Sequence, residues 1–125
     1  MYDKELIMVN VQNIEKSLEN IIEWTTYIKS VDDFLLTNDG MILLNAVCMK
    51  LIAIGEEIKS LDKHTNKNFL SQYTDIQWKE IMGMRDIIAH HYFEIDADKV
   101  FDSIQNDVPM LKETITKIKN DLYNN

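Results

Sequence analysis

Proline, glycine and cysteine are scarce in this sequence of 125 residues, which contains one proline, three glycines and one cysteine. Because glycine and proline mark turns, their scarcity favours long helices over many short strands. The single Cys48 lies in an apolar run, which excludes a disulfide framework and a zinc knuckle. Apolar residues do not alternate with polar ones over any useful length. These absences predict an all-α fold, and the length predicts one domain spanning residues 1–125.

Long apolar segments are also missing. Residues 1–15 contain no continuous apolar stretch of the kind that a secretory signal needs. The most apolar stretch, MILLNAVCMKLIAIG (41–55), is shorter than a membrane span and contains Asn45 and Lys50. We therefore expect a cytoplasmic protein without a membrane partner.

Basic residues are outnumbered, with 13 Lys and Arg against 21 Asp and Glu and a net charge of −8. A protein that binds nucleic acid through its overall field should be basic. The composition therefore argues against nucleic-acid binding by the surface as a whole. If this chain handles a polynucleotide, it has to do so through a local cluster of charge.

The first half of the chain carries helical patterns. Apolar positions near the start alternate in spacing between four and three, which is typical of a helix in a bundle. These positions are Ile7, Val11, Ile14, Leu18, Ile21, Thr25 and Ile28. Ser30 with Asp33 predicts a short second helix. Asn38 or Asp39 can then cap a further helix over about residues 40–60.

The second half begins with a polar loop at residues 59–68. Thr74 and Gln77 then form a capping box, with Tyr73 and Trp78 as the apolar residues of a staple around it. They predict one helix from about residue 74 to about residue 92. Asp96 can cap a last helical region, in which Pro109 kinks or restarts the helix near Val108. The expected architecture is an up-and-down bundle of four or five helices.

Residues 83–96, GMRDIIAHHYFEID, place polar groups in what otherwise looks like buried helix. One stripe of this helix would carry Trp78, Ile81, Arg85, Ile88 and Tyr92. His90 follows Arg85 by five residues, about 140° round the helix, so one straight helix does not bring both together. They converge if the helix distorts after Ala89, or if a second copy lies antiparallel across a symmetry axis and forms a shared cleft.

Each polar side chain also has a structural interpretation. Arg85 can pair with an acidic neighbour, and the candidates are Glu56, Glu57 and Asp86. His90 can be a hydrogen-bonded structural residue, His91 can face solvent, and Tyr92 can cover the end of the bundle. Glu56 and Glu57 otherwise form a solvated helix face. A metal site at His90 and His91 is not expected, because neighbours in a helix point about 100° apart and no third ligand follows.

Taken together, Arg85, His90 and Tyr92 form the pattern Arg-x4-His-x-Tyr, accompanied upstream by AIGEEIKSL and downstream by VPML. This combination resembles the HEPN superfamily, and within it the HepT toxins, the ribonuclease partners of MntA-type minimal nucleotidyltransferases. The resemblance covers most of the chain. It implies a dimerising HEPN-like bundle in which Arg and His of both protomers line an RNA-cleaving cleft. It also implies that the motif tyrosine, Tyr92, receives AMP from the partner enzyme.

The side chains suit this chemistry. RNA supplies its own nucleophile, the 2′-hydroxyl. His90 can transfer protons near neutral pH, and Arg85 can hold two phosphate oxygens, so no metal or other cofactor is required. Four residues are expected in supporting roles, namely Tyr92, Asp86, Glu56 and His91. Glu56 is expected beside Arg85 or His90, whereas Asp86 can orient either of them but also repels phosphate.

The sequence thus predicts a metal-independent endoribonuclease toxin that acts as a homodimer on RNA. An MntA-like nucleotidyltransferase antitoxin would neutralise it by AMPylation of Tyr92, and a larger complex with the antitoxin is open. The alternative is a non-catalytic helical adaptor that presents nucleotide to a nucleotidyltransferase, with Arg85 as a ligand-binding residue. A third interpretation is a structural helical module in which the motif is fortuitous.

Overall fold

The computed structural model describes residues 3–88 and 94–124, and the elements in these ranges are helical. They are α1 (Lys4–Trp24), α2 (Asp32–Leu35), α3 (Asn38–His64), the 3-10 turn η1 (Leu70–Gln72), α4 (Trp78–Met82), α5 (Met84–Ile88), α6 (Ala97–Asp102), the π-helical turn η2 (Ser103–Asp107) and α7 (Val108–Tyr123). The prediction of an all-α bundle is confirmed. Because α6, η2 and α7 follow one another without a gap, the principal rods are α1, α3, α4–α5 and α6–α7.

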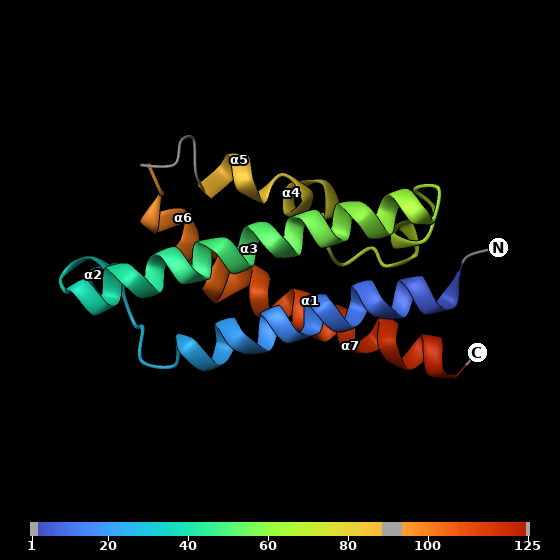
Figure 1. Cartoon of the computed structure of the whole chain (residues 1–125), viewed down its shortest axis with the longest axis horizontal. Coiled ribbons are helices and arrows are strands. Elements are labelled where there is room, and N and C mark those ends of the chain that lie inside the picture. Colours follow the sequence, from blue (N-terminus) through green and yellow to red (C-terminus); the bar gives the residue numbers. More distant parts are fainter. Residues whose placement is uncertain (1–2, 89–93, 125) are drawn as a thin grey trace.

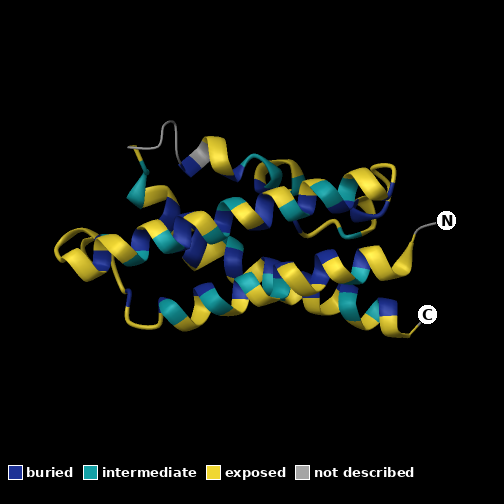
Figure 2. Ribbon diagram, in the orientation of Figure 1, coloured by how far each residue is buried: buried dark blue, intermediate teal, exposed yellow. Residues whose placement is uncertain are grey.

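The long helices lie along one direction, with α1 packed against both α3 and α7 (Figure 1). The short helices α4 and α5 pack on another side of α3. Buried residues face the neighbouring helices (Figure 2), and they form a hydrophobic cluster to which each rod contributes. All seven positions of the predicted α1 seam, Ile7 to Ile28, are buried. Within the described residues, no helix is both long and apolar enough to cross a membrane.

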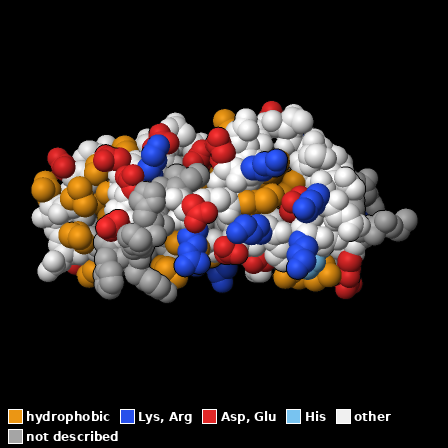
Figure 3. Space-filling model, turned by 90° about the horizontal axis from the view of Figure 1, so that it is seen from above, with side chains coloured by type: hydrophobic (Ala, Val, Ile, Leu, Met, Phe, Trp, Pro, Cys, Tyr) orange, Lys and Arg blue, Asp and Glu red, His pale blue; other side chains and the backbone are white. Residues whose placement is uncertain are grey.

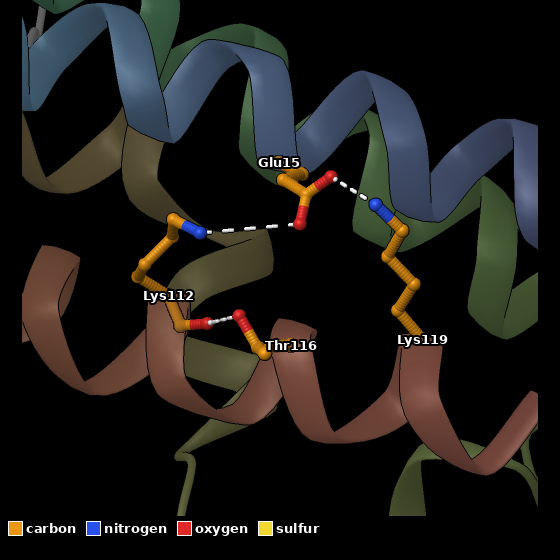
Figure 4. A network of polar contacts seen from close by, with 4 residues as sticks. All are labelled: Glu15, Lys112, Thr116 and Lys119. Carbon is orange, nitrogen blue, oxygen red and sulfur yellow. Dashed lines mark hydrogen bonds and ion pairs between the residues drawn. The ribbon is translucent and has the colours of Figure 1, made fainter.

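Glu15 joins α1 to α7 through two lysines (Figure 4). Its carboxylate accepts a hydrogen bond from Lys119 Nζ at 2.9 Å and lies 3.9 Å from Lys112 Nζ. Thr116, between these lysines, donates instead to the Lys112 carbonyl. All three charged side chains are partly exposed, so the network orients α7 on α1 more than it stabilises the fold.

The start of α3 differs from its predicted capping. Thr37 has extended backbone, and its Oγ1 accepts the N–H of Gly40 at 2.9 Å. Asn38 and Asp39 lie inside the first turn, so the prediction that one of them caps the helix is wrong. The preceding short helix α2 is present as predicted, and the Asp33 carboxylate accepts the backbone N–H of Ser30. Its N-cap residue is Val31, which makes no side-chain capping bond, so only the Asp33 half of the expected capping box is seen.

The prediction of one helix over residues 74–92 is wrong in two respects: the helix starts later, and it is not continuous. The chain turns at residues 74–76, α4 begins at Trp78, and Gln77 precedes it without a side-chain capping bond. Trp78 Nε1 donates to the Tyr73 carbonyl at 2.8 Å, which stabilises this turn. The helix then breaks at Gly83, between α4 and α5. The predicted continuation from residue 89 to Tyr92 lies outside the described residues.

The last helical region begins as predicted. The Asp96 carboxylate accepts the N–H of Lys99 at 3.1 Å and caps α6. Pro109 stands in the first turn of α7, directly after the π-helical turn η2. The prediction that Pro109 restarts the helix near Val108 is therefore confirmed.

Candidate functional site

Arg85 lies on the exposed side of α5. The adjacent Met84 is 4% exposed and Ile88 is fully buried, whereas Arg85 and Asp86 face solvent. The predicted stripe that aligned Arg85 with Ile81 and Ile88 is therefore wrong. The inward positions are instead Ile81, Met84 and Ile88, which are spaced three and four residues apart.

Met84 fixes the orientation of α5. Its Cβ lies 3.7 Å from the position that a Cβ on Gly55 would occupy, and its Sδ accepts a weak hydrogen bond from the buried Ser103 Oγ at 3.7 Å. Met84 is thus held between α3 and η2, which directs the neighbouring Arg85 side chain outward. An exposed guanidinium on a well-packed short helix suits a group that contacts an external anion.

The acidic partners considered for Arg85 are engaged elsewhere. Glu56 pairs with Lys59 at 3.7 Å, and both side chains are about half exposed. Glu57 is partly buried and accepts hydrogen bonds from Asn10 Nδ2 at 2.7 Å and Asn13 Nδ2 at 3.1 Å. The interpretation of Glu57 as part of a solvated face is therefore wrong, because it joins α3 to α1.

Arg85 itself is available. Across residues 3–88 and 94–124, no hydrogen bond or ion pair engages its guanidinium, and Asp86 is not paired with it. The structural interpretation, in which Arg85 holds an acidic neighbour, is thus not seen. Whether Glu56 or Asp86 acts on His90 stays a prediction.

The remaining motif residues, His90, His91 and Tyr92, lie outside the described residues. The backbone on either side of them is joined, because the Asp96 N–H donates to the Ile88 carbonyl at 2.8 Å. This bond brings the end of α5 to the start of α6. The motif thus begins on α5 at Arg85 and continues into a segment of which both flanks are anchored in the bundle.

Other reactive groups are poorly placed for catalysis. Cys48 is buried, and this burial raises the pKa of its thiol, which disfavours the nucleophilic thiolate. His64 is exposed at the end of α3, where its Nε2 lies 3.3 Å from Ser60 Oγ. In the part of the chain that the structure describes, no group of three or more His, Cys, Asp or Glu side chains could hold a metal ion.

Sequence reasoning missed Asp107, which ends η2. Burial raises the pKa of its carboxyl, a hydrogen bond with Ser103 lowers it, and the carboxylates of Asp102 and Glu80 raise it further. The carboxylate of Asp107 in η2 is therefore repelled by that of Glu80 in α4. No sequence pattern singles it out, since its environment depends on the π-helical turn.

A helical bundle that presents an exposed arginine, without a partner among the described residues and shortly before His90 and Tyr92 in the sequence, agrees with what the resemblance to the HEPN superfamily implies. A family model described as "Ribonuclease HepT-like" matches residues 14–118. The chain belongs to this HepT-like ribonuclease family. The resemblance stated from the sequence is confirmed, and with it the prediction of a ribonuclease at the level of the family.

Curated relatives agree with this assignment. A Methanocaldococcus jannaschii protein named "Gamma-glutamylcyclotransferase and putative RNase" is 35% identical over 119 residues, which is 95% of this chain and 50% of that protein. A Caldanaerobacter subterraneus "Putative RNase" is 31% identical over 86% of this chain and 89% of its own length. A Thermococcus cleftensis "Probable ribonuclease HepT" is 29% identical over 87% and 92%, respectively. The chain thus spans half the length of the first of these relatives. No solved structure matches it.

Proposed function

We propose that this chain is a metal-independent endoribonuclease toxin that acts as a homodimer in the cytoplasm. The proposal rests on the exposed Arg85, which has no partner among residues 3–88 and 94–124 and precedes the segment that holds His90, in a chain of the HepT-like ribonuclease family. An arginine without a protein partner is ready to bind a phosphate.

The reaction follows from these side chains. The 2′-oxygen of RNA attacks the adjacent phosphorus while a base removes its proton, and the 5′-oxygen leaves as it receives a proton. The products are a 2′,3′-cyclic phosphate and a 5′-hydroxyl. His90 of one protomer can serve as base and His90 of the other as acid, because imidazole titrates near neutral pH. Arg85 stabilises the charge that develops on the phosphorane oxygens.

Exposed apolar residues just after α2 and on the first half of α3 support the homodimer. Leu36 is 76% exposed, Ile42 is 67% exposed and Met49 is 65% exposed. Ile42 and Met49 are seven residues apart and therefore lie on one face of α3. Grouped apolar side chains on a surface are typical of protein contacts, and a second copy of this chain is the occupant we propose.

Regulation follows from Tyr92. We propose that an MntA-like nucleotidyltransferase antitoxin attaches AMP to its hydroxyl, alone or within a larger complex. Tyr92 follows Arg85 by seven residues in the sequence. The added phosphodiester would bind the guanidinium of Arg85 in place of RNA. Inhibition would then need no change of fold.

Incubation of the purified protein with a synthetic RNA tests the proposal. Cleavage should persist in EDTA and leave 2′,3′-cyclic phosphate ends, and a substrate methylated at every 2′-oxygen should stay intact. Full cleavage of the methylated substrate, or a complete loss of activity in EDTA, would exclude this mechanism. Absence of cleavage by a folded dimer would favour the adaptor function, which the net charge of −8 otherwise supports.

A further inference from the structure

The acidic charge of this chain is unevenly distributed. Residues 59–85 contain five basic residues against three acidic ones, a net charge of +2. The rest of the chain contains eight basic residues against 18 acidic ones, a net charge of −10. The basic residues of this segment are Lys59, Lys63, Lys67, Lys79 and Arg85, and all five are exposed.

The fold gathers these residues on the side of the molecule that carries α4, α5 and the second half of α3. Seen from that side, Lys and Arg side chains cluster over these elements, whereas hydrophobic and acidic side chains predominate near the α2 end (Figure 3). The packing of Gly55 against the backbone of Ile81 sets α4 and α5 beside this half of α3. Lys59 and Lys63 follow Gly55 by one and two turns, about 6 and 12 Å along the helix.

The turn that follows α3 has an unusual backbone conformation. Asn66 and Lys67 both have left-handed backbone, with φ of 55° and 64°. The turn is closed by a bond from the Lys67 N–H to the Asp62 carbonyl at 2.9 Å, and the buried Thr65 hydroxyl donates to the Leu61 carbonyl. Glycine adopts this conformation without the steric cost that a lysine incurs. A lysine therefore stands where a glycine would fit with less strain.

We propose that Lys59, Lys63, Lys67 and Lys79 form a binding surface for the phosphate backbone of single-stranded RNA, which leads the strand to Arg85. This inference rests on the proposed ribonuclease function. Lysine ammonium groups bind phosphates as point charges and do so without reading the sequence, as substrate capture requires. The surface explains how a chain of net charge −8 holds a polyanion through a local basic cluster.

The four lysines are accessible for this role. Lys59 makes a long ion pair of 3.7 Å with the half-exposed Glu56, a contact that a phosphate can replace. Lys63 stands in the last turn of α3, where a cation also stabilises the helix dipole. Lys67 lies beyond the end of α3, so that structural role does not apply to it. The experiment must therefore separate stability from binding.

Two double variants of equal charge provide the test. Lys63→Gln with Lys67→Gln removes two charges from the proposed surface, and Lys16→Gln with Lys29→Gln removes two exposed charges from elsewhere on the chain. The probe is a fluorescent single-stranded RNA methylated at its 2′-oxygens, so that binding is measured without cleavage. Anisotropy titrations over a range of KCl concentrations give the dissociation constant and its salt dependence.

The surface variant should bind RNA more weakly. The magnitude of the slope of log K against log salt should be smaller by about 1.4, since each phosphate contact to a single strand contributes about 0.7. The matched control should keep the slope of the parent. Equal behaviour of the two double variants would overturn this inference and leave the ribonuclease proposal intact. A folded parent that binds no RNA at low salt would overturn both.

A single substitution separates binding from folding further. Lys67→Gly removes the ammonium group and relieves the left-handed strain, so the melting temperature should be equal to or above that of the parent. RNA binding should nevertheless weaken, and the magnitude of the slope of log K against log salt should be smaller by about 0.7. If Lys67→Gly binds RNA as tightly as the parent, Lys67 is not part of the surface, and the turn has no role in substrate capture.

Discussion

Gly55 of α3 lies so close to Ile81 of α4 that a Cβ on Gly55 would stand 2.7 Å from the Ile81 carbonyl oxygen. The same glycine faces Met84, which orients α5 and Arg85. A side chain at this position would therefore move the helices that carry the start of the motif. The substitution of Gly55 by alanine tests this relationship.

Gly55→Ala should destabilise the fold by about 1–3 kcal/mol, because the added methyl group meets backbone that cannot easily yield. RNA cleavage should fall as well, since Arg85 moves with α5. Gly83→Ala is the matched control: its added Cβ would lie 3.4 Å from the nearest atom, and its φ of −89° suits alanine. Thermal melts that rank the two variants equally would contradict the role given to Gly55.

Arg85→Ala or His90→Ala should abolish RNA cleavage while leaving the helical content unchanged. Removal of one positioned acid–base group typically lowers a rate by about 10²–10⁴-fold. Arg85 is exposed and without a partner among the described residues, so its loss should also cost little stability. Lys29→Ala, another exposed cation, serves as the control. Circular dichroism and a cleavage assay check both points, and an active Arg85→Ala protein would remove Arg85 from the site.

The dimer should have about twice the 14.7 kDa chain mass in light scattering at micromolar concentration. Ile42→Asp with Met49→Asp should yield a monomer that melts near the parent temperature, because both side chains are about two-thirds exposed. The monomer should lose cleavage if both protomers supply His90. Val9→Asp, at 52% exposure on α1, should remain dimeric. A parent that is monomeric under these conditions contradicts the shared cleft.

Tyr92→Phe should escape AMPylation and remain toxic in the presence of the antitoxin. Intact-mass spectrometry after co-expression with a cognate nucleotidyltransferase should show one or more AMP additions on the parent, which map to the peptide that contains Tyr92. Tyr73→Phe is a suitable control, because the Tyr73 hydroxyl is held by Asp121 at 2.8 Å. If Tyr92→Phe is modified and neutralised like the parent, the regulatory proposal is wrong and the ribonuclease proposal stands.

Asp107→Asn should stabilise the fold at neutral pH. The folded-state pKa of Asp107 is raised, chiefly by burial, so the folded chain holds this proton more tightly than the unfolded chain. The stabilisation that comes from this tighter proton binding is thus fully present below the ordinary aspartate pKa. It is lost as the pH rises through the folded-state pKa of Asp107. The gain in stability on Asp107→Asn should be under about 1 kcal/mol at pH 7 and vanish in acid. Asp98→Asn, on the exposed side of α6, is the control variant. Melting curves across pH values compare the two.

The α1 seam could be predicted because its apolar period reports directly on burial, and Ile7 to Ile28 behave accordingly. Asp96 and Pro109 could be predicted because capping and helix restart depend on residues that are adjacent in sequence. These features are local, so a pattern is enough to find them.

The break between α4 and α5 could not be predicted in the same way. Gly83 alone is tolerated inside many helices, and the break becomes clear only with the close approach of Gly55 to Ile81. The outward orientation of Arg85 depends on that tertiary contact. For the same reason the burial of Glu57 was missed, because its partners Asn10 and Asn13 are distant in sequence.

The pairing of α1 with α7 places the start of α1 and the end of α7 together, at the end of the bundle opposite α2 (Figure 1). Lys4 and Leu122, from the first and last turns, line the same shallow groove. A fused domain or an affinity tag on either end would therefore project from that end and leave the apolar face of α2 uncovered. This geometry is compatible with further sequence fused at that end, and the matched region makes up 50% of the length of the Methanocaldococcus jannaschii protein.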